Sequence, residues 1–120
     1  MLSLTAATRI YLYRGPCDMR KSFDSLCGLI RSELGADPLS GSLFVFVNRR
    51  RNMVKLLYWD RDGLAIWYKR LERGGFTPPA LRAQKHQIDR RQLSMLLEGV
   101  VPKKMEKRYT PGTEKLDISY

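Results

Sequence analysis

The chain has 120 residues, 43% of them hydrophobic, with 22 lysines and arginines against 12 aspartates and glutamates. This length fits a single domain with a modest core, and the apolar content excludes general disorder. No apolar run approaches the roughly 20 residues that a membrane-spanning helix requires, and the N-terminus does not resemble a signal peptide. We therefore expect a cytoplasmic, nucleoid-associated protein whose formal net charge of +10 suits nucleic acid before an acidic protein or an anionic membrane.

The first part of the chain predicts one strand and one helix. Residues 9–13 alternate in the way that is typical of a short strand. After a Gly-Pro break, Asp18 can cap a helix that ends at Gly35. Apolar residues recur at helical spacing between these two positions, so we expect this stripe, including Phe23 and Ile30, to lie in the core.

Three strand-like runs follow, at residues 43–47, 53–59 and 64–70. Their connections are short, and Asp62-Gly63 in the second connection is a strong hairpin signal. Short connections force antiparallel neighbours, so the sequence predicts a three-stranded meander. With the N-terminal strand it would form a small antiparallel sheet, packed with one main helix in an α+β domain of two layers. Both faces of the sheet carry apolar residues, so we expect partial cover on both.

A second helix is predicted to begin after Asp89. Asp89 as N-cap and Gln92 three residues later have the spacing of a capping box. Ile88 and Leu93 stand where a hydrophobic staple would place them, and Gly99 would end the helix.

Positive charge is unevenly distributed along the chain. Residues 42–74 hold eight basic and three acidic groups, and residues 82–108 again hold eight and three. From Pro102 onward the sequence is polar and basic. We therefore expect one domain over residues 1–101 and a basic, flexible C-terminal tail over residues 102–120.

The densest positive charge lies in the connection between the first two strands of the meander. In a meander the third strand runs parallel to the first, so the end of the third strand should lie near this connection. The predicted nucleic-acid-binding patch consists of Arg49, Arg50, Arg51, Lys69, Arg70 and Arg73. Arginine suits this role because its planar fork of donors matches phosphate geometry and can also recognise guanine. The alternative is a solvated rim that keeps a small protein soluble.

Four aromatic residues lie on the last two strands of the meander: Tyr58, Trp59, Trp67 and Tyr68. Aromatic side chains can stack on exposed bases. On strands they serve more often in the core or in cross-strand packing, and we expect that role here.

Candidate catalytic and metal-binding groups are few. Asp60 and Asp62 resemble a pair of metal-holding carboxylates, but their place in a glycine-containing turn favours turn formation and solvation. His86 has no evident Ser, Cys or Asp constellation, so surface placement is expected. Cys17 and Cys27 do not make a disulfide framework or, with a single histidine, a zinc site. We therefore predict no catalytic residues, no metal and no cofactor.

Two stretches, GPCDMRKSFDSL and FVFVNRRRNMVKLLYWDRDGLAIWYKRLERGGF, closely resemble the TnpB accessory protein family of insertion-sequence family sixty-six. The family is also called the second open reading frame product of these elements, and the likeness covers about residues 9–99. The resemblance implies a bacterial mobile-element protein needed for transposition. It also implies that a separate, larger transposase carries the strand-cutting carboxylates.

Three functions are consistent with these observations. The first is a non-catalytic accessory protein that binds DNA, at element ends or nonspecifically, and helps to assemble the transposition complex. The second is an adaptor whose main partner is the transposase, with incidental nucleic-acid binding. The third, a metal-dependent nuclease, is disfavoured because the ligand count is unsupported.

Overall fold

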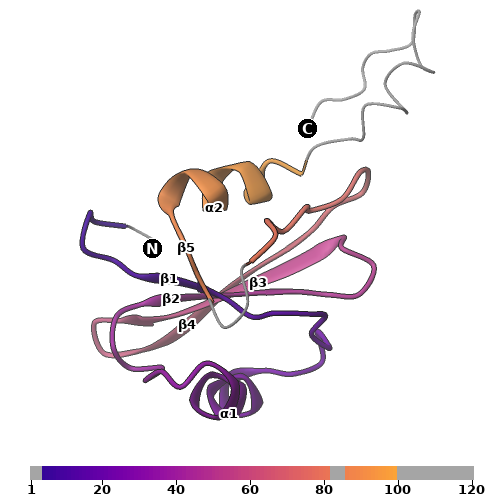
Figure 1. Cartoon of the computed structure of the whole chain (residues 1–120). Coiled ribbons are helices and arrows are strands. Elements are labelled where there is room, and N and C mark those ends of the chain that lie inside the picture. Colours follow the sequence, from indigo (N-terminus) through magenta and orange to yellow (C-terminus); the bar gives the residue numbers. More distant parts are fainter. Residues whose placement is uncertain (1–3, 82–85, 100–120) are drawn as a thin grey trace, which may run out of the picture.

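The computed structural model describes residues 4–81 and 86–99, and within them five strands form one mixed sheet (Figure 1). The strands are β1 (Ile10–Leu12), β2 (Leu43–Val47), β3 (Met53–Asp60), β4 (Gly63–Arg70) and β5 (Gln87–Ile88). Their order across the sheet is β4-β3-β2-β1-β5. Helices α1 (Phe23–Glu33) and α2 (Arg90–Leu97) lie on opposite sides of the sheet. The expected α+β class is confirmed, and the helices extend it from two layers to three.

The predicted three-stranded meander is confirmed. β2 pairs antiparallel with β3, and β3 pairs antiparallel with β4. The hairpin forms where the sequence predicts it, but Asp60 stands opposite Gly63, so the two turn residues are Arg61 and Asp62. Arg61, not Gly63, takes the positive φ, of 60°. The pairing runs without interruption from Met53 opposite Arg70 to that turn, so the hairpin contains no bulge.

The sheet differs from the prediction in two ways: one strand pair is parallel, and the sheet has one additional strand. β1 pairs with β2 in parallel, with Ile10 opposite Leu43, because the chain crosses between them through α1. β5 was not predicted and pairs antiparallel with β1, with Ile10 opposite Ile88. Two residues are too short to leave an alternating pattern in the sequence.

The N-cap of helix α1 lies four residues after the predicted cap, Asp18. The Asp18 carboxylate accepts the backbone N–H of Arg20 (2.9 Å), and the Asp18 carbonyl accepts the N–H of Lys21 (3.1 Å). These bonds close a turn, so Asp18 is not the N-cap. Ser22 takes that position, and its backbone N–H donates to the Ser25 hydroxyl (3.1 Å). The predicted end is correct, since Gly35 follows the helix with a φ of 59°.

The core placement of Phe23 is wrong, whereas that of Ile30 is confirmed. Phe23 stands on the first turn of α1, at the end of the apolar stripe, and remains 42% exposed. Ile30 is 0% exposed in the middle of the same stripe.

Phe23→Ala is therefore expected to lower the free energy of unfolding by less than about 1 kcal/mol. Ile30→Ala is the matched control and should cost about 3 kcal/mol, because it leaves a cavity in a closed site. Urea unfolding followed by circular dichroism measures both. Equal losses in the free energy of unfolding for the two variants would show that Phe23 is a core residue.

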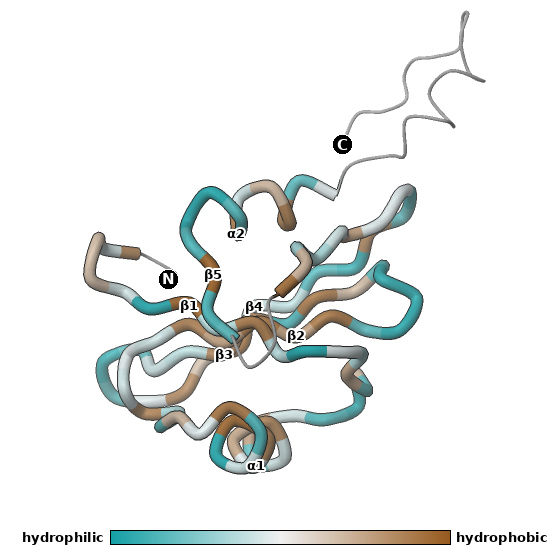
Figure 2. Tube along the Cα trace, viewed as in Figure 1, coloured by the Kyte–Doolittle hydropathy of each residue, from teal (hydrophilic) through white to brown (hydrophobic). Residues whose placement is uncertain are grey.

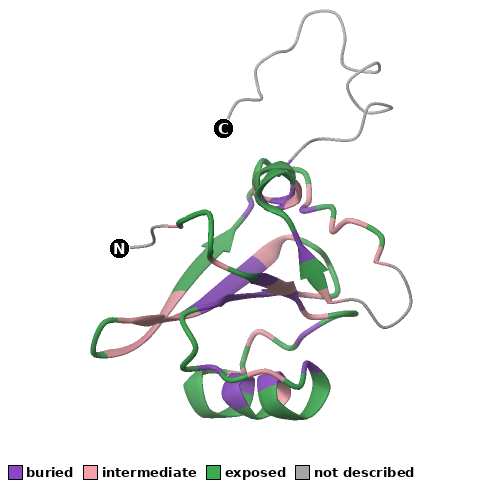
Figure 3. Cartoon of the chain, turned by 60° about the vertical axis from the view of Figure 1, so that its left-hand side comes forward, coloured by how far each residue is buried: buried purple, intermediate pink, exposed green. Residues whose placement is uncertain are grey.

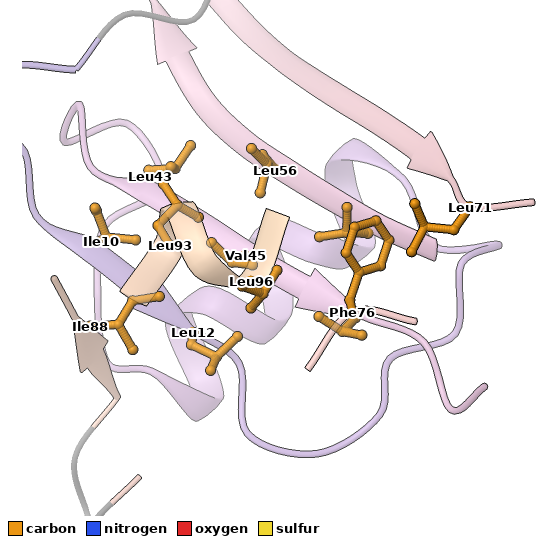
Figure 4. Packing of buried hydrophobic residues seen from close by; sticks show 12 residues of the cluster. Ile10, Leu12, Leu43, Val45, Leu56, Leu71, Phe76, Ile88, Leu93 and Leu96 are labelled. Atoms are coloured by element: carbon orange, nitrogen blue, oxygen red, sulfur yellow. The ribbon is translucent and has the colours of Figure 1, made fainter. Parts of the chain in front are cut away.

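Each face of the sheet carries one apolar cluster under one helix. The cluster on the α1 side contains Cys17, Leu26, Cys27, Ile30, Leu34, Phe44, Phe46 and Leu57. The cluster on the α2 side includes Val45, Leu56, Leu71, Phe76, Leu93 and Leu96, which converge in Figure 4. Figure 2 shows hydrophobic colour concentrated along the strands between the helices, and Figure 3 shows the central strands buried. The expected partial cover of both faces is confirmed, with α2 and the segment at 71–76 as the second cover.

Helix α2 forms as its capping signals predict. The Asp89 carboxylate accepts the N–H of Gln92 (2.8 Å), and the Gln92 side chain accepts the N–H of Asp89 (2.9 Å). The staple residues Ile88 and Leu93 are both buried in the α2-side cluster. Gly99 follows the helix with a φ of 62°, which favours glycine. The predicted tail at 102–120, and with it the domain boundary, lies outside the described residues.

Candidate nucleic-acid interface

Residues 48–52, which we call the arginine loop, join β2 to β3. Asn48 organises the loop from its base. Its side-chain oxygen accepts the backbone N–H groups of Asn52 (3.0 Å) and Met53 (2.9 Å), and its amide nitrogen donates to the Asn52 side chain (2.8 Å). Its own backbone N–H donates to the Met53 carbonyl (3.1 Å). The loop is therefore a hydrogen-bonded unit, and it forms a hydrophilic tip between apolar strands in Figure 2.

A second segment, residues 71–76, supports the arginine loop from outside. The Arg51 carbonyl accepts the N–H of Phe76 (2.7 Å), and the Asn52 carbonyl accepts the N–H of Leu71 (2.7 Å). Phe76 is 1% exposed, so the donor that holds Arg51 is anchored in the core. Arg51 itself has a φ of 61°, and a Cβ atom on Gly75 would approach its carbonyl oxygen to 3.2 Å. The three arginines are thus presented from a backbone fixed on both sides.

Asn48→Ala is expected to destabilise the fold by about 2 kcal/mol, because two backbone N–H groups lose their acceptor. Asn52→Ala is the matched control. It removes only one bond between side chains and should cost less than half as much. Thermal unfolding of both variants measures the difference. Equal losses would show that the Asn48 side chain does not organise the loop.

The meander brings the end of β4 beside the arginine loop, as its topology predicts. Lys69 stands opposite Val54, and Arg70 stands opposite Met53, the first residue after the loop. All six residues of the predicted patch are exposed. The side chains of neighbouring strand residues point to opposite faces. Lys69 and Arg70 therefore place positive charge on both faces at this end of the sheet. Arg70 also forms an exposed ion pair with Glu72 (3.1 Å), which partly offsets its charge.

A hollow of about 500 Å³ lies beside the arginine loop. Arg49 and Arg51 line it together with Arg14, which the sequence did not indicate. Arg14 reaches this place because β1 and β2 are parallel, so the residues after both strands meet at one edge. Tyr13 also lines the hollow, and its backbone N–H donates to the Val45 carbonyl (2.9 Å). Among the described residues that line it, none is acidic.

Lys55 is buried on the α1 side of the sheet, although it is charged and lies in a central strand. It is 7% exposed, and its Nζ donates to the carbonyls of Met19 (2.8 Å) and Lys21 (2.7 Å). The same nitrogen lies 4.7 Å from the centre of the Tyr68 ring. Lys55 therefore fastens the turn before α1 to the sheet and does not add to the basic patch.

The exposed pair Asp18 and Arg20 lies in that same turn. Their side chains form an ion pair (2.7 Å), and hydrogen bonds from Arg20 lower the pKa of the Asp18 carboxyl to about 2. Because this pKa is lowered in the folded state, the contribution of the pair is present above the ordinary carboxyl pKa. It is lost as the pH falls toward 2. Arg20 is thus locally neutralised.

The expected core placement of the aromatic residues is wrong for two of the four. Trp67 is 36% exposed and Tyr68 is 51% exposed on β4, the outermost strand of the meander. The Tyr68 hydroxyl donates to the Met53 sulfur (3.3 Å). Tyr58 and Trp59 on β3 are partly buried, and Tyr58 packs against the α2-side cluster. The outer strand has a neighbour on one side only, which explains the difference.

Asp60 and Asp62 lie in the turn between β3 and β4, where the Asp62 N–H donates to the Asp60 carbonyl (2.6 Å). Over residues 4–81 and 86–99, no group of three or more His, Cys, Asp or Glu residues could hold a metal ion. Cys17 and Cys27 are free and buried, and burial raises the pKa of both thiols. His86 is half-buried, and its carbonyl accepts the Leu12 N–H (2.7 Å). In the described parts of the chain, no helix is long and apolar enough to cross a membrane.

Comparisons with known proteins place the chain in a family. A family model described as IS66 Orf2 like protein matches residues 8–107. The uncharacterized proteins y4hO and y4jC of Sinorhizobium fredii are 36% and 32% identical over 100 residues, which are 83% of this chain. These alignments cover 87% of y4hO and 86% of y4jC. No solved structure matches. The chain therefore belongs to the IS66 Orf2-like family of accessory proteins of transposition.

Proposed function

We propose that the protein is a non-catalytic transposition accessory that binds DNA through the arginine loop and helps to assemble the transposition complex. The observation that carries the proposal is the fixed loop. Asn48 holds it from within and the N–H of Phe76 holds it from outside, so three adjacent guanidinium groups share one rigid support. A fixed cluster loses less conformational entropy on binding than a mobile one.

The charges around the loop suit a phosphate backbone. Among the described residues, no carboxylate pairs with Arg49, Arg50 or Arg51. Lys69, Arg70 and Arg73 extend the same edge, and the hollow beside the loop adds Arg14. Contacts of this kind position a protein on DNA, and any base recognition would come from one of the loop arginines.

A second candidate function is an adaptor that binds the transposase, with DNA binding incidental. The exposed aromatic side chains of Trp67 and Tyr68 favour it, because aromatic residues are enriched in protein interfaces. They lie on β4, whose last residues also belong to the proposed DNA-binding patch.

Fluorescence titration of the purified protein against element-end DNA and random duplexes of equal length tests the proposal. Measurements at two salt concentrations should show an affinity that falls as salt rises, because neutralised phosphates release counterions. The duplexes should remain intact with magnesium or manganese, since the family resemblance implies that a separate transposase carries the strand-cutting carboxylates. Absent or salt-insensitive DNA binding, together with tight binding to the transposase, would favour the adaptor. Cleavage lost in Asp60→Ala or Asp62→Ala would overturn the non-catalytic assignment.

A further inference from the structure

The outer edge of β4 offers backbone groups to a further strand. β3 lies on one side of β4, and no strand of the described chain lies on the other. The Leu71 N–H donates to the Asn52 carbonyl (2.7 Å), so odd-numbered residues along β4 direct their backbone groups toward β3. Alternate residues of an antiparallel strand face opposite sides. The outward-facing residues are therefore Leu64, Ile66, Tyr68 and Arg70.

This edge has little of the protection that isolated sheet edges usually have. β4 has eight residues, whereas strands usually have about five or six. It contains neither proline nor a bulge. Its charged residues are Lys69 and Arg70, both at one end. The opposite edge of the sheet, β5, has two residues and is protected by its shortness. Figure 3 shows β4 changing from half-buried to exposed along its length.

We propose that β4 pairs antiparallel with β4 of a second copy of this chain, with Ile66 of each copy on the twofold axis. Two registers of the paired β4 strands bring the outward-facing backbone groups of both copies into hydrogen-bonded pairs near the middle of the strand. The twofold axis passes through Ile66 in one register and through Trp67 in the other. The Ile66 axis brings Asp62, which lies in the turn just before β4, level with Arg70 of the second copy. The Trp67 axis would place Asp62 opposite Glu72. Opposite charges across strands stabilise and like charges destabilise, so charge selects the Ile66 axis.

Side-chain sizes also suit this register. Leu64 stands opposite Tyr68 of the second copy on the α1 side, and Ala65 stands opposite Trp67 on the α2 side. Each aromatic ring, exposed in the single chain, is thus matched with a smaller side chain. The three central pairs add about six backbone hydrogen bonds. Pairing therefore gives hydrogen-bond partners to the outward-facing backbone groups of β4 and covers both aromatic side chains.

The net charge of +10 does not prevent this pairing. The arginine loop lies level with Glu72, six residues along the strand from Ile66, because Leu71 bonds to Asn52. At ~3.4 Å per residue, the two arginine loops stand roughly 40 Å apart along the joined sheet. That is several times the screening length of ~8 Å at physiological salt. The strongest charges of the two copies therefore repel weakly.

Sedimentation equilibrium without DNA tests the dimer and does not depend on the proposed function. The expected mass is twice the 13.9 kDa of one chain. Ile66→Cys should form a disulfide-linked dimer on mild oxidation, because hydrogen-bonded partners have Cα atoms about 5.5 Å apart, within disulfide range. Trp67→Cys is the register control and should cross-link poorly. Wild-type protein controls for Cys17 and Cys27, which are buried.

Charge reversal supplies a second test. Arg70→Asp and Asp62→Arg should each weaken dimerisation at least severalfold, and the double variant should restore it. A mass of 13.9 kDa at all concentrations up to several hundred micromolar would overturn the proposal. A dimer that Ile66→Cys does not trap would assign the interface elsewhere. A monomer whose binding to transposase is lost in Tyr68→Pro would instead assign the edge to a strand of the transposase.

Discussion

Replacing Arg49, Arg50 and Arg51 together by alanine is expected to flatten the log–log salt dependence of duplex affinity by roughly 2 to 3. Each phosphate contact contributes about 0.9 to that slope, because its neutralisation releases condensed counterions. At about 0.1 M salt the affinity should fall on the order of 10²- to 10³-fold. That loss follows from the same change in slope, taken over the tenfold step in salt from about 1 M, where the counterion contribution vanishes. Fluorescence anisotropy across a salt series measures both quantities.

The matched control removes the same charge elsewhere. Arg9, Arg31 and Arg91 are exposed and lie outside the basic patch, so their replacement by alanine also lowers the net charge by three. It should leave most of the slope intact if the position of the charge matters. The fold of the loop variant should be unchanged, because the loop is held through backbone groups and through Asn48. A folded loop variant with its full affinity and slope would make the loop a solvated rim and leave the adaptor function.

The parts of the fold that could be predicted depend on local signals. The Asp-Gly signal at residues 62 and 63 locates one hairpin to within one residue, and Asp89 with Gln92 defines the start of α2. The parallel pairing of β1 could not be predicted in this way, because its partner is fixed by a crossover through α1. The start of α1 was missed because two residues, Asp18 and Ser22, both have the chemistry of a cap. The bonds of Asp18 to its own turn decide between them.

The candidate site shows the same division. The arginine loop and the nearby end of β4 follow from consecutive arginines and from meander topology, both of which can be read locally. Arg14 joins them only through the parallel pairing of β1 and β2, which no local pattern contains. The buried role of Lys55 was missed because its acceptors, Met19 and Lys21, lie more than thirty residues earlier. A lysine on a strand gives no sequence signal for carbonyls that distant.

Lys55→Ala is expected to lower the free energy of unfolding by about 4 kcal/mol. Hydrogen bonds to a charged group contribute ~1.5–3 kcal/mol each, and truncation also leaves a cavity where the side chain crossed the α1-side layer. Lys55→Met keeps most of the volume but loses the ammonium over the Tyr68 ring and the two bonds to the carbonyls of Met19 and Lys21. At the lower end of the range for two such bonds, about 3 kcal/mol is expected. Urea unfolding of both variants separates the packing contribution from the hydrogen bonds.

The matched control is Lys69→Ala in the neighbouring β4, where Lys69 follows Tyr68, the residue opposite Lys55. Lys69 is exposed, so its removal should change stability by less than about 0.5 kcal/mol. The variants should also differ locally, because Lys55 fastens the turn before α1. In Lys55→Met, amide exchange should accelerate at residues 18–22 before it does in β3, whereas Lys69→Ala should leave that turn protected. If Lys55→Met loses no stability and its turn stays protected, the two carbonyl bonds do not hold the turn, and the apolar cluster under α1 must hold it instead.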